Sequence, residues 1–143
     1  EAAVIEKRAG DYREASFYYS KAYKYSPNNR AAIYGLVENL LKLKKTEEAL
    51  AILDEFKFSG ELDSKFYKLQ AETLYLLERQ VSSKMAMAEH YFTIGETALA
   101  AEQLRVARDN SNITNYQRLK VVARLSELEK ILVKENEQKK NRM

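Results

Sequence analysis

Glycine and proline, which do most to decide where helices begin and end, are scarce in this chain: its 143 residues contain four glycines and one proline. A β-sandwich or barrel turns about every 8 to 12 residues and needs many more of them. The proline, Pro27, follows Gly10 in the segment GDYREASFYYSKAYKYSPNN. Because proline cannot continue a helix and disfavours a helical residue before it, we expect a helix to end near Tyr25. The composition therefore predicts an all-α protein.

Small and aromatic residues recur at helical spacing in that segment. Ala15, Tyr19 and Ala22 lie at i, i+4 and i+7, on one stripe of a helix, where small side chains let a neighbouring helix approach closely. The signal returns at Ala49 in KLKKTEEALAILDEF, and again after Gly95 in GETALAAEQLRVA. These residue types at these spacings resemble the tetratricopeptide repeat, a helix–turn–helix unit of about 34 residues, which is also the separation of Ala15 and Ala49.

The resemblance implies a tetratricopeptide-like α-solenoid of about eight antiparallel helices. Gly10 and Gly95 are separated by two and a half repeats instead of a whole number, so one helix must stand out of regular register. The best candidate is residues 63–78, which have a helical pattern but no clean partner. The expected helices are 1–9, 11–25, 30–43, 46–58, 63–77, 81–94, 96–109 and 115–133. The residues that the resemblance assigns to packing between repeats are Gly10, Ala15, Tyr19, Ala22, Pro27, Ala49, Gly95, Ala100 and Ala107.

Several side chains are suited to cap these helices. Thr114 and Gln117 form a capping-box signature at the start of the last one. Other candidate N-cap residues are Asn28, Asn29 and Thr46.

One domain, residues 1–133, is expected, closed by a capping helix at 115–133. The polar tail, 134–143, is expected to fray. If Gly10 is a turn residue, the helix before it lacks a turn or more, which predicts a fragment of a longer chain.

Residues for catalysis or metal binding are not visible in this segment. Without cysteine there can be no disulfide, thiolate metal site or cysteine nucleophile. His90 is the only histidine, whereas the His-Glu-x-x-His site of zinc peptidases needs two. We therefore expect no catalytic residue, metal site or cofactor here, and expect His90 to be a surface or groove residue.

Charge and hydropathy narrow the class of partner. The net charge is +3, from 24 basic and 21 acidic residues spread along the chain, which is too little to indicate a nucleic-acid site. No apolar run approaches the roughly 18 residues of a membrane span. Protein or peptide segments remain the expected partners.

In a solenoid of this kind, the first helix of each repeat lines a concave binding face. The resemblance assigns to that groove Tyr34, Glu38, Leu41, Lys42, Met85, Glu89 and Phe92. One branch of the family grips the acidic C-terminus of heat-shock chaperones with basic and amide side chains, and Glu38 and Glu89 depart from that pattern. Carboxylates would repel an acidic tail, so extended or amphipathic segments are expected instead. Leu41 and Phe92 could equally pack against neighbouring helices.

A narrower resemblance rests on three stretches: QAETLY, MAMAEHYFTIGETALAAEQLRVARD and QRLKVVARLSELE. Together they resemble the C-terminal repeat domain of periplasmic zinc metallopeptidases of the β-barrel-assembly-enhancing protease type. The resemblance implies a periplasmic, non-catalytic interaction domain, with zinc and the His-Glu-x-x-His site in an upstream peptidase domain. Its partners would be that peptidase domain and proteins of outer-membrane assembly.

Two other functions stay open. The chain could be a stand-alone cytoplasmic tetratricopeptide adaptor or co-chaperone. A nucleic-acid-binding helical repeat is the weakest alternative, because the charge is balanced and the turns follow the tetratricopeptide pattern.

Overall fold

Seven α-helices account for most of the residues that the computed structural model describes, which are 2–58 and 61–142. No strand occurs in these residues, so the all-α fold class is confirmed. The helices form two compact units, residues 1–62 and 63–143.

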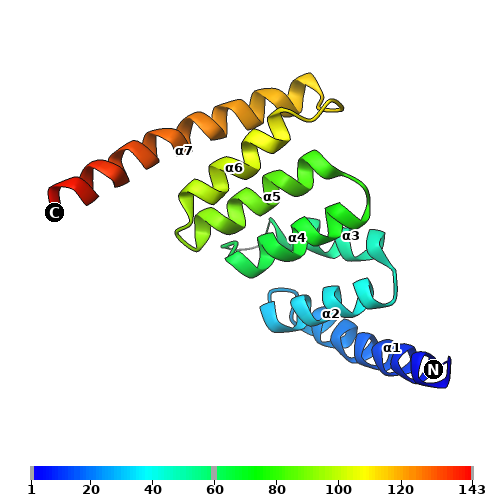
Figure 1. The fold of residues 1–143 in the computed structure, drawn as a ribbon. Helices are drawn as coiled ribbons and strands as arrows, with labels where there is room; N and C mark the ends of the chain where they lie inside the picture. Colours follow the sequence, from blue (N-terminus) through cyan, green and yellow to red (C-terminus); the bar gives the residue numbers. More distant parts are fainter. Residues whose placement is uncertain (1, 59–60, 143) are drawn as a thin grey trace. The chain divides into compact units, whose positions relative to one another are not determined.

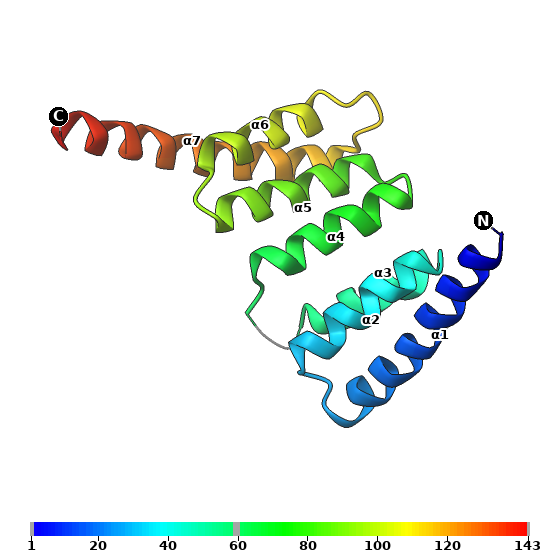
Figure 2. The ribbon, with the colours of Figure 1, turned by 60° about the horizontal axis from the view of Figure 1, so that its bottom comes forward.

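The first unit contains α1 (Ala2–Tyr25), α2 (Arg30–Lys42) and α3 (Thr46–Phe56). Consecutive helices of this unit run antiparallel in Figures 1 and 2. The end of α1 before Pro27 agrees with the prediction. Asn29 caps α2, because its Oδ1 accepts a hydrogen bond from the backbone N–H of Ala32 at 3.1 Å.

Tyrosines of α1 pack against the two helices that follow. A Cβ atom at Gly35 of α2 would lie 2.5 Å from the ring of Tyr19, so the ring sits where only glycine leaves room. Tyr23 makes a side-chain hydrogen bond with Glu55 of α3. Burial, and then this carboxylate, raise the pKa of Tyr23 to about 12, so the phenol stays protonated as a donor at neutral pH.

Gly10 lies inside α1, which runs through it without a break. The turn expected at Gly10, and the separate helices expected at 1–9 and 11–25, are therefore wrong. The residues before Gly10 are mostly strong helix formers, and glycine inside a helix costs only about 1 kcal/mol relative to alanine. A turn would give up several helical hydrogen bonds. The missing turn of the first helix was inferred from a turn at Gly10, so it no longer follows.

The second unit contains α4 (Ser64–Leu76), α5 (Gln80–Thr93), α6 (Thr97–Arg108) and α7 (Asn115–Arg142). In Figures 1 and 2, α4, α5 and α6 lie side by side, and the C-terminal end of α7 projects beyond α6. The predicted capping box precedes α7: the Gln117 N–H donates to Thr114 Oγ1, and the Thr114 N–H donates to Gln117 Oε1. One buried core cluster of this unit contains Val81, Ala88, Ala100, Ala101, Leu104, Ala107, Val121, Leu125 and Leu128.

Three turns share one backbone geometry, although only one of them contains glycine. Lys44, Glu78 and Gly95 follow α2, α4 and α5 with φ of 61°, 61° and 84°. In each turn, the residue with positive φ donates its N–H to the carbonyl three residues back, and the next N–H donates to the carbonyl five residues before it. This is the Schellman arrangement, in which a left-handed residue ends the helix. Glu78 follows Lys44 by one repeat length, and Gly95 follows Glu78 by half of one.

Side chains of small or moderate size occupy equivalent positions around each of these turns, seven residues before and five residues after the turn residue. All six are buried: Val37 with Ala49, Ala71 with Ser83, and Ala88 with Ala100. The helix pairs α2–α3, α4–α5 and α5–α6 are therefore equivalent hairpins, with α5 shared by two of them. The expected half repeat is present.

The expectation that residues 63–78 lack a partner is wrong, because α4 pairs with α5. Ser83 Oγ donates to the carbonyl oxygen of Ala71 at 2.7 Å. His90 Nδ1 lies 3.0 Å from the carbonyl oxygen of Ser64, at the other end of the same hairpin. The sequence concealed this pairing because Glu78 replaces the glycine that usually marks such a turn.

Two expected helix boundaries also change. Residues 134–142 continue α7 instead of fraying, since lysine, glutamate and glutamine are good helix formers. Thr97 Oγ1 donates to Glu135 Oε1 at 2.9 Å, which ties this extension to the start of α6. At α3, Lys45 and not Thr46 occupies the N-cap position.

We predict that Glu78→Gly stabilises the protein by roughly 0.5–1 kcal/mol, because a left-handed backbone strains a residue that has a Cβ. Gly95→Glu should destabilise it by a similar amount. No atom outside the immediate chain lies within 4 Å of a Cβ at Gly95, so the loss there is conformational. Thermal unfolding measures both changes. Glu78→Ala is the control for losing the side chain alone, and equal stability of Glu78→Gly and Glu78→Ala would contradict the prediction.

Candidate functional site

The groove residues expected in the first unit do not form one open surface. Tyr34 is only 5% exposed, and its ring packs edge-to-face against Phe56 with 6.1 Å between centroids. Its assignment to the groove is therefore wrong, because Tyr34 belongs to the core. Leu41 is half-buried, while Glu38 and Lys42 are exposed. Helical spacing predicted which residues of α2 share a face, but it could not predict how many of these residues are buried.

The groove residues expected in the second unit lie on the face of α5 that contacts α7. Arg124 of α7 donates from Nε and Nη2 to the two carboxylate oxygens of Glu89, at 2.8 and 3.1 Å. Its Nη1 donates to Glu127 at 2.8 Å, and its guanidinium lies 4.8 Å from the centre of the Phe92 ring. Met85 and Phe92 are half-buried and pack against the core of this unit.

On this face, Arg124 lies between two carboxylates, those of Glu89 and Glu127. The hydrogen bond to Glu89 raises the pKa of Arg124 above its already high value, so the guanidinium stays charged. On α4, burial raises the pKa of Tyr67, the Glu89 carboxylate raises it further, and Arg124 partly offsets both. Because Arg124 pairs with Glu89, this carboxylate is not a free charge on the face, as the sequence suggested it would be. This face of α5 therefore packs against α7.

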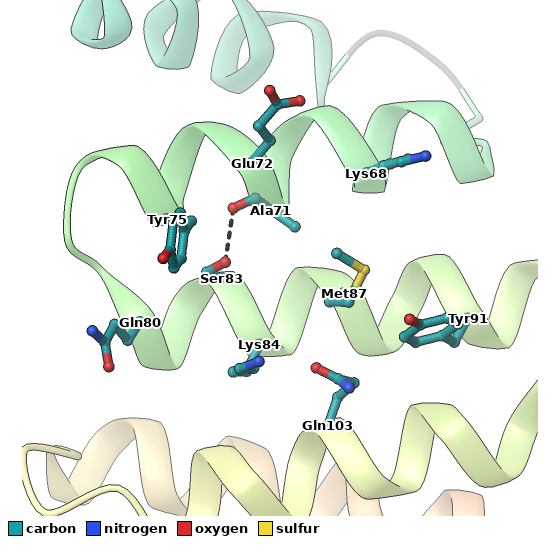
Figure 3. A pocket seen from close by; sticks show the side chains of 10 residues that line it. All are labelled: Lys68, Ala71, Glu72, Tyr75, Gln80, Ser83, Lys84, Met87, Tyr91 and Gln103. Carbon is teal, nitrogen blue, oxygen red and sulfur yellow. Dashed lines mark hydrogen bonds between the residues drawn. The ribbon is translucent and has the colours of Figure 1, made fainter.

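A groove of about 540 Å³ lies on the opposite face of α5 (Figure 3). At 3.6 residues per turn, its positions on α5 are centred about half a turn from Met85, Glu89 and Phe92. The neighbouring helices α4 and α6 supply the rest of the lining. The residues that line it are Lys68, Ala71, Glu72, Tyr75, Gln80, Ser83, Lys84, Met87, Tyr91 and Gln103.

The groove follows from the close approach of α4 and α5. Ala71 and Ser83 reach only a short distance from their backbones, and the hydrogen bond between them holds the helices together (Figure 3). Short side chains at the centre leave a hollow that the longer side chains of Tyr75, Met87 and Tyr91 border. The packing that builds the hairpin thus also makes the groove.

The residues that line the groove are better suited to binding a peptide than to catalysing a reaction. Tyrosine and methionine offer adaptable apolar contact, and the amides of Gln80 and Gln103 can donate to and accept from a peptide backbone. In the described part of the chain, no three histidine or carboxylate side chains gather closely enough to hold a metal ion. His90 packs against the backbone at Ser64.

The residues that the sequence assigned to packing occupy varied places. Ala49, Ala100 and Ala107 are buried, whereas Ala15 and Ala22 are half-buried. Tyr19 covers Gly35, Gly95 forms a turn, and Pro27 is exposed in the loop after α1. Gly10 is an exposed helical residue.

The groove was not among the sites predicted from the sequence, although the sequence contains a pattern that indicates it. Gln80, Lys84, Met87 and Tyr91 are spaced i, i+4, i+7 and i+11, the spacing of one helical face. The lining that α4 adds to that face depends on the α4–α5 hairpin, and the turn of this hairpin carries Glu78 in place of glycine.

Residues 8–72 match the tetratricopeptide repeat family. The match supports a tetratricopeptide repeat domain, and such repeats are generally non-catalytic and mediate protein–protein interaction. No curated protein matches the chain. None of the helices in residues 2–58 and 61–142 has both the length and the hydropathy needed to cross a membrane.

We predict that Arg124→Ala lowers the free energy of unfolding by about 1–2 kcal/mol, because it removes charged hydrogen bonds that are mostly shielded from water. The side chains of Arg124 and Glu89 are 28% and 29% exposed. Arg142→Ala, on the exposed end of the same helix, is the matched control and should change stability little. Denaturant unfolding measures both variants. If they unfold at the same midpoint, the contact between α5 and α7 is not stabilising.

Proposed function

We propose that this chain is a non-catalytic domain that binds a protein segment in the groove lined by α4, α5 and α6. The observation that carries the proposal is the groove itself, with its floor of short side chains, its apolar border of Tyr75, Met87 and Tyr91, and its two amide side chains. An extended segment fits this lining, because apolar side chains can enter the hollow while the amides satisfy its backbone.

The test uses peptides selected from a random phage-displayed library on the purified protein. We expect Tyr75→Ala to weaken binding of the selected peptides about tenfold, the usual loss when a useful aromatic contact is removed. Fluorescence polarisation with labelled peptides measures the affinity. Circular dichroism first establishes that each variant is folded.

Tyr116→Ala is the matched control, because Tyr116 is a tyrosine of α7 outside the groove with nearly the same exposure, 67% against 65% for Tyr75. It should bind like the wild type. Equal affinities of wild type, Tyr75→Ala and Tyr116→Ala would place binding elsewhere and overturn the proposal.

We propose further that the domain is the C-terminal repeat region of a periplasmic zinc metallopeptidase that acts in outer-membrane protein assembly. The support is the sequence resemblance carried by parts of α4, α5, α6 and α7. Zinc would then belong to the peptidase domain, and this domain would engage that domain, its substrates or envelope assembly proteins.

The coding sequence upstream of Glu1 tests this parentage. We expect it to encode a His-Glu-x-x-His helix and, before that, a signal peptide. A complete upstream sequence with neither would overturn the parentage and favour the stand-alone cytoplasmic adaptor.

A further inference from the structure

A row of six exposed residues runs along α7 on the side turned away from the core of the second unit. Their intervals alternate between three and four residues, which is the spacing of the contact face in a coiled coil. By helical geometry this row lies opposite the buried residues Val121, Leu125 and Leu128. We call the row the α7 stripe, and its members are Tyr116, Leu119, Ala123, Ser126, Lys130 and Val133.

Large apolar side chains occupy both ends of the α7 stripe, and short side chains occupy its middle. Tyr116, Leu119 and Val133 are 67%, 73% and 56% exposed. Single exposed apolar residues are common on protein surfaces, but these three share one face of one helix. Ala123 and Ser126 lie between them, and their short side chains allow a second helix to approach closely. The stripe therefore has the form of a helix-packing surface that this chain leaves uncovered.

The order of large and small residues fits a second copy of the same helix. An antiparallel copy, related by a two-fold axis midway along the stripe, brings three kinds of residue pair into contact, each of them twice. Large side chains then meet at the two ends, short ones meet at the centre, and the aliphatic part of a lysine covers a leucine. The pairs are Tyr116 with Val133, Leu119 with Lys130, and Ala123 with Ser126.

Charges on one edge of the stripe are complementary under the same symmetry. Lys120 and Glu127 are both exposed and lie seven residues apart, so they share one side of α7. The antiparallel register sets Lys120 within two residues, or about 3 Å along the axis, of Glu127 of the second copy. A parallel pair in register would keep the two charges about 10 Å apart along the axis. Two ion pairs therefore favour the antiparallel arrangement.

Both charged groups already have a neighbour within their own helix. The ammonium group of Lys120 lies 4.5 Å from the centre of the Tyr116 ring. Glu127 accepts a hydrogen bond from Arg124 at 2.8 Å, and it is 62% exposed. A carboxylate can accept more than one hydrogen bond, so Glu127 can also accept from a lysine of a second copy.

We propose that a second copy of this chain binds along the α7 stripe in the antiparallel orientation and forms a two-fold symmetric dimer. The occupant is argued from the charge complementarity of Lys120 and Glu127 and from the order of large and small residues in the stripe. This inference goes beyond the proposed function and does not rest on it. The groove lies on the face of α5 opposite to the one that contacts α7, so the dimer leaves both grooves open.

Sedimentation of the purified chain at several concentrations measures dimer formation. We expect the wild type to dimerise with a micromolar Kd, and Leu119→Glu to weaken the dimer at least about tenfold, because the carboxylate enters the interface twice. Leu99→Glu is the matched control, because Leu99 is a leucine of α6 that is 46% exposed and lies outside the stripe. It should dimerise like the wild type. A wild type that stays monomeric, or a dimer that Leu119→Glu leaves intact, would overturn the proposal.

Charge reversal tests the pairing of Lys120 with Glu127. Lys120→Glu and Glu127→Lys should each dimerise about tenfold more weakly than the wild type, because like charges then face each other twice. A mixture of the two variants should form a heterodimer, since both of its ion pairs are restored. A variant that merely unfolds, or that only loses the contact with Arg124, cannot imitate this recovery. A mixture no more associated than its components would overturn the proposed pairing.

Disulfide cross-linking tests the orientation. The chain has no cysteine, so an introduced cysteine is unique. Tyr116→Cys and Val133→Cys should cross-link when they are mixed. Neither should cross-link alone, because the same residue in two antiparallel copies lies about 25 Å apart along the axis. Cross-linking of Tyr116→Cys with itself would indicate a parallel dimer and overturn the proposal. Binding of an unrelated helix or a lipid vesicle to a chain that stays monomeric would overturn the assigned occupant.

Discussion

The close approach of antiparallel helices at a left-handed turn is the constraint on which the other features of this protein depend. Each turn at Lys44, Glu78 and Gly95 ends one helix and starts the next at a fixed offset. The residues seven before and five after the turn are buried in all three cases, and their side chains are of small or moderate size. The backbone geometry of the turn and the size of these two side chains favour the same close helix packing.

The same constraint gives α5 two different faces. As the second helix of one hairpin and the first of the next, α5 has neighbours on both sides. The face with Met85, Glu89 and Phe92 is fastened to α7 through Arg124. The opposite face is left with a hollow above Ala71 and Ser83. A helix shared by two hairpins can therefore contribute one face to stability while the other remains open to a partner.

The helical class, most helix boundaries and two of the caps could be predicted from the sequence, because they depend on local signals such as Pro27, Asn29 and the Thr114–Gln117 box. The predictions were wrong where one residue type is compatible with two backbone conformations. Glycine at position 10 permits a turn but does not require one, and a helix continues through it at small cost. Glu78 adopts the left-handed conformation, and a glycine at this position would have indicated the turn in the sequence. The buried position of Tyr34 depends on contact with Phe56, and helical spacing does not reveal such a contact.

Charge was the least predictable property of the candidate site, because the effect of a charged residue depends on its partner. The sequence predicts that Glu89 is a free carboxylate in a binding groove. In the structure, Arg124, which is distant in the sequence, donates two hydrogen bonds to it. Since Arg124 holds the Glu89 carboxylate, the repulsion of acidic partners that was expected from this residue no longer follows. Tertiary contacts therefore determine whether a charged side chain is available to a partner, and these contacts cannot be seen in the sequence.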